Sequence, residues 1–173
     1  MRDPVDAGRI RQLMEALDRA AHEAGRVYLT GGGTAVLMGW RSSTIDVEVK
    51  FIPDNDAILR AIPGIKEDLR LNIELASPVD FIPVPEGWEE RSTFIDQLDR
   101  LSFFHFDLYA QAMAKVERGH EQDLADVQAM QTRGLIDAER ALEYFDRLEP
   151  DLYRYPAIHA PAFRRAVEDM FRT

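Results

Sequence analysis

The sequence predicts an α+β fold, in which a mixed β-sheet core with flanking helices is followed by a helical C-terminal half. Up to about residue 106, short extended stretches alternate with stretches of helical periodicity, and from Asp107 onward only the helical pattern remains. The 173 residues fit a single compact unit with a substantial core. We therefore expect a core over residues 1–106 and a helical region over 107–173 that packs on it.

The first half begins with a helix, because apolar side chains recur at helical spacing between Val5 and Ala24 and Gly25 follows them. A short strand, a glycine loop, a short helix and an alternating strand come next, over residues 27–29, 31–33, 34–38 and 44–50. Beyond a turn at Pro53, Asp54 and Asn55, a helix runs to about Ile62, and a second short helix follows Gly64.

Further strands are expected over residues 72–76, 79–84 and 101–106, with a turn-rich loop over 83–91 between the last two. The C-terminal half should contain four helices, over residues 107–118, 121–133, 137–148 and 162–171. Prolines at 156 and 161 predict an extended segment over 151–163.

Composition excludes several classes of site. Cysteine is absent, so disulfides, thiolate zinc sites and a cysteine nucleophile are excluded, and a reducing cytoplasm is the expected compartment. The four histidines do not have zinc-helix spacing, and we interpret them as surface or packing residues. No stretch has the apolar length of a signal segment or a membrane span. A net charge of −10 opposes indiscriminate binding to nucleic acid.

The most informative stretch starts with three glycines, Gly31, Gly32 and Gly33. They lie between a strand and a helical run that begins at Thr34, where backbone N–H groups can point at an anion. Only residues without a side chain let a phosphate come this close to the backbone. Glycine triplets also occur in plain turns, so the spacing to the next strand carries the argument.

That next strand carries Asp46 and Glu48 on one face, with apolar residues on the other. Their Cα atoms are expected roughly 6 to 7 Å apart, a spacing that suits one or two Mg²⁺ ions. Asp80 is the third acid of the predicted metal site, because a lone charge in an apolar strand is costly unless it is paired. The alternative is that Asp80 begins a turn after Pro78 and is simply solvated.

A glycine loop followed by an acid–apolar–acid strand resembles the nucleotidyltransferase superfamily, which has the polymerase-beta-like fold. The matching residues are Gly32, Gly33 and Thr34, followed by Asp46, Val47 and Glu48. Within the superfamily the chain is most similar to a small bacterial branch that includes abortive-infection toxins and minimal nucleotidyltransferases. In that branch an arginine and a hydroxyl residue precede the acids, as do Arg41, Ser43 and Thr44 here. The second acid, Glu48, stands where aspartate is commoner.

The resemblance implies a nucleoside triphosphate (NTP) as substrate, Mg²⁺ held by Asp46, Glu48 and Asp80, and transfer of a nucleoside monophosphate to a hydroxyl acceptor. It assigns phosphate binding to the glycine loop, Thr34, Arg41, Thr44 and Arg118. It also matches the later run of Lys115, Arg118, Asp123 and Asp126. Lys115, with Arg41, would balance the triphosphate charge, and we expect Asp123 to position Lys115 or Arg118.

Other interpretations remain open at this stage. The helix that carries Lys115 and Arg118 could present an ordinary solvated face. Because fold does not establish activity, the chain could instead be an inactive nucleotidyltransferase-fold module with a binding or regulatory role, such as one component of a toxin–antitoxin pair with a cognate protein partner. A structural helical adaptor is the third alternative. For an active enzyme, the acceptor could be a small molecule, a protein, a tRNA end or another nucleotide.

Overall fold

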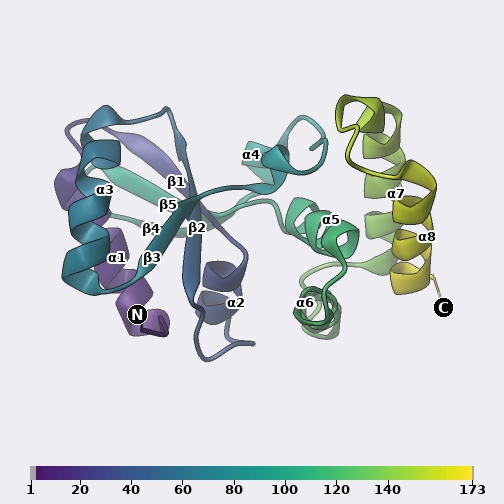
Figure 1. Ribbon diagram of the computed structural model, residues 1–173, viewed down its shortest axis with the longest axis horizontal. Helices are drawn as coiled ribbons and strands as arrows, with labels where there is room; N and C mark the ends of the chain where they lie inside the picture. Colours follow the sequence, from purple (N-terminus) through teal and green to yellow (C-terminus); the bar gives the residue numbers. More distant parts are fainter. Residues whose placement is uncertain (1–2, 173) are drawn as a thin grey trace. The chain divides into compact units, whose positions relative to one another are not determined.

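The computed structural model describes residues 3–172 and confirms the α+β class, with a five-stranded mixed sheet and many helices (Figure 1). The chain forms two compact units. The first contains the chain up to Ser77 together with Ser92–Phe106, and the second contains Pro78–Arg91 together with the chain from Asp107 onward. Within residues 3–172, no helix is long and apolar enough to cross a membrane.

The sheet belongs to the first unit and has the strand order β3-β2-β1-β5-β4. The central strand β1 (Gly25–Thr30) pairs antiparallel with β2 (Asp46–Ile52) and parallel with β5 (Leu101–His105). β3 (Asn72–Leu75) pairs parallel with β2, and β4 (Thr93–Gln97) pairs antiparallel with β5. β1 and β2 therefore lie side by side, with Thr30 opposite Glu48.

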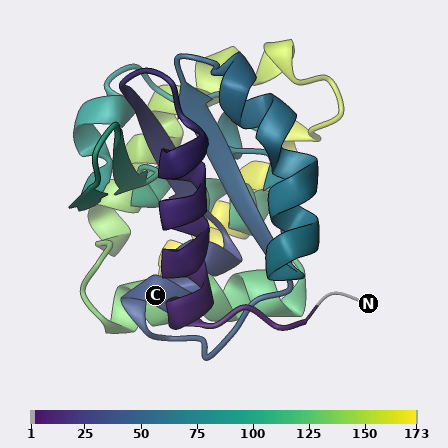
Figure 2. The same ribbon diagram turned by 90° about the vertical axis from the view of Figure 1, so that its left-hand side faces the viewer.

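Three helices share one core with the sheet: α1 (Ala7–Ala20), α2 (Gly32–Met38) and α3 (Asp56–Leu69). Figure 2 shows α1 and α3 side by side on the face of the sheet that forms this core. Val27, Leu29, Val47 and Val49 contribute to the core from the strands. Alternation along the strands then turns Asp46 and Glu48 to the opposite face, as the sequence predicted.

A buried carboxylate fixes the turn between β4 and β5. Asp18 in α1 accepts hydrogen bonds from the backbone N–H groups of Asp99, Arg100 and Leu101, at 3.3, 2.9 and 2.9 Å. A carboxylate that accepts several N–H bonds makes charge-assisted, stronger hydrogen bonds. Asp18 therefore ties the first helix to the last two strands of the sheet.

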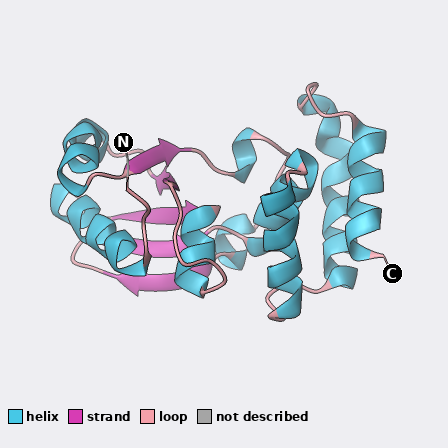
Figure 3. Ribbon diagram, turned by 60° about the horizontal axis from the view of Figure 1, so that its bottom comes forward, coloured by secondary structure: helices cyan, strands magenta, loops and turns pink. Residues whose placement is uncertain are grey.

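The second unit is helical (Figure 3). Its elements are the 3₁₀ helix η1 (Pro78–Asp80), α4 (Trp88–Arg91), α5 (Leu108–Arg118), α6 (Glu121–Thr132), α7 (Ala138–Leu148), the 3₁₀ helix η2 (Glu149–Arg154) and α8 (Ala160–Phe171). A buried network joins α4 to α5 and α7, because Asp107 accepts from Arg91 Nε at 2.8 Å and from the Tyr144 hydroxyl at 3.0 Å. The Tyr155 hydroxyl also donates to the carbonyl of Val79 at 2.7 Å.

Several predictions of secondary structure were wrong. Helix α3 is continuous through Pro63, which is exposed while the neighbouring Ile62 is buried. Burial of the apolar face holds this helix together where the proline removes one backbone hydrogen bond. The stretch 79–84, expected to be a strand, instead begins within the short 3₁₀ helix η1 and continues without a strand, and 151–163 is helical at both ends. Strand β4 was not predicted.

Candidate functional site

The glycine loop joins β1 to α2, and this helix starts two residues before Thr34, where the sequence predicted its start. Gly31 has a φ of 64° and ψ of −132°, a backbone conformation available to glycine alone, and α2 begins at Gly32. The carboxylate of Glu48 lies over Gly31, because a Cβ atom built there would be 3.1 and 3.2 Å from its two oxygens. The acid strand and the glycine loop therefore meet at this point.

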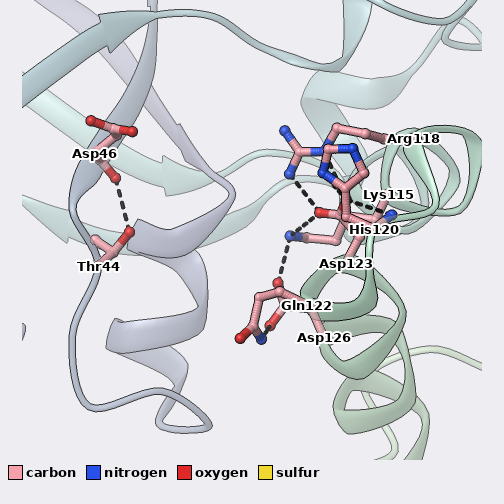
Figure 4. Close-up of polar contacts among 8 residues, drawn as sticks. All are labelled: Thr44, Asp46, Lys115, Arg118, His120, Gln122, Asp123 and Asp126. Carbon is pink, nitrogen blue, oxygen red and sulfur yellow. Dashed lines mark hydrogen bonds and ion pairs between the residues drawn. The ribbon is translucent and has the colours of Figure 1, made fainter.

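Two other predicted residues meet the loop at Gly32. A Cβ atom at Gly32 would lie 2.0 Å from Thr44 Oγ1 and 3.4 Å from Arg41 Nη1. The space that a side chain would occupy is therefore filled by a hydroxyl and bordered by a guanidinium. Thr44 is fixed by its backbone pairing with Val5 and by a 3.1 Å hydrogen bond from its hydroxyl to the carbonyl of Asp46 (Figure 4).

The last two loop residues face the interior. A Cβ atom at Gly33 would contact Val47 at 3.6 Å. The Thr34 side chain is fully buried, and its hydroxyl donates to the carbonyl of Leu29 at 3.3 Å and lies 3.0 Å from Nδ1 of His105.

Asp46 and Glu48 are alternate residues of β2, so their side chains project from the same face of the sheet. Asp46 Oδ1 accepts a hydrogen bond from Asn72 Nδ2 at 2.8 Å. Glu48 lies opposite Glu74 in the register between β2 and β3. Both acids are half-buried, and their hard oxygen atoms fit Mg²⁺, which binds proteins through one or two carboxylates. Across residues 3–172 no group of three or more acidic, histidine or cysteine side chains has the arrangement of a complete metal site.

Asp80 belongs to the second unit, whereas Asp46 and Glu48 belong to the first. It is the last residue of η1 and is exposed. The sequence predicted that Asp80 would be a charge inside an apolar strand. That prediction is wrong, because this stretch is not a strand and Asp80 is not buried.

Lys115 and Arg118 form ion pairs between α5 and α6 (Figure 4). Lys115 Nζ is 2.7 Å from Asp126 Oδ2 and 3.9 Å from Asp123 Oδ1, and all three side chains are almost completely buried. Arg118 contacts Asp123 through both Nε and Nη2. Burial alone would raise the pKa of Asp123, but the hydrogen bond and charge of Arg118, with the charge of Lys115, hold this pKa below its usual value. The expected pairing of Asp123 with Arg118 is confirmed.

The structure therefore brings part of the predicted site together within the first unit. Residues of the loop, the following turn and the acid strand converge, namely Gly31, Gly32, Arg41, Thr44 and Glu48, and Asp46 is joined to them through its backbone carbonyl. Two features were not predicted from the sequence. Asn72 donates a hydrogen bond to Asp46, and His105, interpreted as a surface or packing residue, contacts Thr34. An asparagine on a strand gives no distinctive signal by itself, because its partner is set by sheet register.

A protein-family model matches the chain over residues 8–153. The family is described as nucleotidyltransferase of unknown function (DUF6036). Comparison with curated proteins and with solved structures gave no significant match. The matched region spans most of the chain, including the glycine loop, the acid strand and helices α5 to α7. The chain therefore belongs to this family of nucleotidyltransferases.

Proposed function

We propose that this protein is a Mg²⁺-dependent nucleotidyltransferase that moves a nucleoside monophosphate from an NTP to a hydroxyl acceptor. The observation that carries the proposal is the meeting of the Glu48 carboxylate, the Thr44 hydroxyl and the Arg41 guanidinium at Gly31 and Gly32. Membership of the nucleotidyltransferase family supports it independently. A cation, an acid strand and the backbone donors of a glycine loop are the parts that phosphoryl transfer requires.

Each of these residues has a distinct proposed task. The backbone of Gly31, Gly32 and Gly33 binds the β and γ phosphates, and Arg41 neutralises their charge. Thr44 donates its hydroxyl to the same phosphates when NTP is bound. Asp46 and Glu48 would hold Mg²⁺, which would supply charge neutralisation and Lewis-acid activation of the triphosphate.

The predicted residues of the second unit enter the proposal separately. Asp80 as a third metal ligand, and Lys115 and Arg118 as phosphate-binding cations, are tested by Asp80→Asn, Lys115→Met and Arg118→Met. Lys115 and Arg118 already have carboxylate partners in α6, so binding of a triphosphate by these cations would compete with Asp126 and Asp123.

The test is label transfer from each of the four NTPs, carrying label in the α phosphate, in the presence of Mg²⁺ and cell extract. Products are separated into small-molecule, protein and RNA fractions, which identifies the class of acceptor. We expect transfer by the native protein and none by Asp46→Asn or Glu48→Gln. Glu74→Gln is the matched control, because it makes the same chemical change at an exposed acid on the neighbouring strand. Equal label transfer by Asp46→Asn and the native protein would refute the enzymatic assignment.

Thermal denaturation with NTP and Mg²⁺ distinguishes an enzyme without its acceptor from a module that binds nothing. A ligand that binds only the folded state stabilises it by mass action. We expect a higher melting temperature with NTP plus Mg²⁺ and a smaller shift in Arg41→Met. No rise in melting temperature with any NTP plus Mg²⁺ would favour the alternative of an inactive module.

A further inference from the structure

His105 is a buried histidine to which the proposed reaction assigns no task. It is the last residue of β5 and is paired with Leu29 of β1, so it lies on the core side of the sheet. Its side chain is 5% exposed, and burial lowers its pKa to about 4, so it is neutral at physiological pH. A buried imidazole needs hydrogen-bond partners, and the glycine-loop helix provides one.

A short chain of hydrogen bonds runs from His105 into this helix. The Thr34 hydroxyl donates to the carbonyl of Leu29 at 3.3 Å, and the same carbonyl accepts from the backbone N–H of Phe106 at 2.8 Å. The Thr34 hydroxyl thus lies within reach of both the Leu29 carbonyl, at 3.3 Å, and Nδ1 of His105, at 3.0 Å. In the Nδ1–H tautomer, His105 donates from Nδ1 to Thr34 Oγ1 while the hydroxyl donates to Leu29, so that one chain of hydrogen bonds joins β5, α2 and β1.

We propose that His105 is a positioning residue, which holds the glycine loop in its phosphate-binding conformation through Thr34. Thr34 follows the three glycines directly and lies in the first turn of α2. Three consecutive glycines have more backbone freedom than any other sequence of that length. The hydrogen bonds from His105 and Thr34 fix the C-terminal end of this flexible segment to β1 and β5. The part of the inference that concerns NTP affinity rests on the proposed function.

The first measurement concerns the loop itself and needs no nucleotide. In ¹⁵N-labelled protein, the amide signals and hydrogen-exchange rates of Gly31, Gly32 and Gly33 report the loop conformation. We expect His105→Leu and Thr34→Val to shift these signals and to speed exchange about tenfold. His105→Asn, whose side-chain amide can donate near the position of Nδ1, and Thr34→Ser should preserve the native signals. The side-chain ¹⁵N shifts of native His105 should show the Nδ1–H tautomer.

The second measurement is NTP affinity in the presence of Mg²⁺, by calorimetry. Ordering a loop residue costs conformational entropy, so loss of the anchor should weaken NTP binding about tenfold. The double variant His105→Leu with Thr34→Val should bind no more weakly than either single variant, because both remove the same anchor. If His105→Leu fails to fold, Thr34→Val, which keeps the shape of the side chain, carries the same test.

The outcomes separate this inference from the proposed function. Altered glycine amides in His105→Leu and Thr34→Val, together with no NTP binding by the native protein, would support the anchor and refute the nucleotidyltransferase proposal. Native NTP binding with unchanged glycine amides and unchanged affinity in both variants would overturn the anchor alone. Additive losses of affinity in the double variant would also overturn it, because His105 and Thr34 would then act independently.

Discussion

The buried ion pair between Lys115 and Asp126 gives a quantitative prediction about the second unit. The Lys115 side chain is 7% exposed and that of Asp126 is 0% exposed, and their charged atoms are 2.7 Å apart. Removing one member of a buried pair leaves an uncompensated charge, whereas replacing both by apolar side chains is often neutral. We therefore compare Lys115→Met, Asp126→Leu and the double variant.

The expected magnitudes follow from the remaining partners. Asp126→Leu leaves Lys115 with Asp123 at 3.9 Å, so the free energy of unfolding should fall by about 3 kcal/mol, the lower end for a broken buried pair. Lys115→Met removes the cation from the buried Asp126 carboxylate, which keeps the hydrogen bond from Gln122 at 3.2 Å, and should cost about 3 to 5 kcal/mol. The double variant should lie within about 1 kcal/mol of the native protein.

The assay is urea denaturation near neutral pH, followed by the fluorescence of Trp88 in a Trp40→Phe background. Trp88 lies in the second unit and Trp40 in the first, so this signal reports the unit that contains the ion pair. Asp151→Asn is the control, because its ion pair with Arg154 is half-exposed and should contribute less than about 1 kcal/mol. Single losses below about 1 kcal/mol, or a double variant whose loss equals the sum of the singles, would refute the reasoning.

Three further predictions concern the first unit. Gly32→Ala should lower the free energy of unfolding by about 1 to 3 kcal/mol in chemical denaturation, because the new methyl group would lie 2.0 Å from Thr44 Oγ1; an unchanged value would contradict the close contact. Because the pKa of His105 falls from 6.5 unfolded to about 4 folded, the unfolded state binds the proton first, and stability present above pH 6.5 is lost toward pH 4. Between about pH 8 and about pH 5 this loss should be about 2 kcal/mol, seen in native protein and in the exposed-site control His22→Asn but not in His105→Asn. Asp18→Ala should cost about 2 to 4 kcal/mol in a thermal melt, because its carboxylate accepts three backbone N–H groups at the turn between β4 and β5; a change below about 0.5 kcal/mol would contradict this role.

Much of the glycine-loop region could be predicted from the sequence because its signals are local. Glycine at Gly31 is required by a positive φ, and alternation alone places Asp46 and Glu48 on one face of a strand. The convergence of Glu48 on Gly31 then follows from the pairing of β1 with β2, neighbouring strands joined through a short helix.

Other features depend on contacts distant in sequence, which a local pattern does not contain. Pro63 normally ends a helix, but burial of Ile58 and Ile62 in the core outweighs one missing hydrogen bond. Strand β4 is poor in buried residues because it lies at the edge of the sheet, so it lacks an alternating apolar pattern. The contact of His105 with Thr34 links residues 71 positions apart and exists only because β5 pairs with β1.

The division of the two units along the chain constrains how this protein can be made and dissected. Each unit is assembled from two separate pieces of sequence, and the chain passes between units after Ser77, Arg91 and Phe106. During vectorial synthesis, β2 and β3 emerge from the ribosome before β5, the neighbour of β1, has been translated. Truncation after residue 106 would deprive Arg91 of Asp107. An expressible fragment of the first unit therefore requires residues 78–91 to be replaced by a short linker, rather than a stop codon alone.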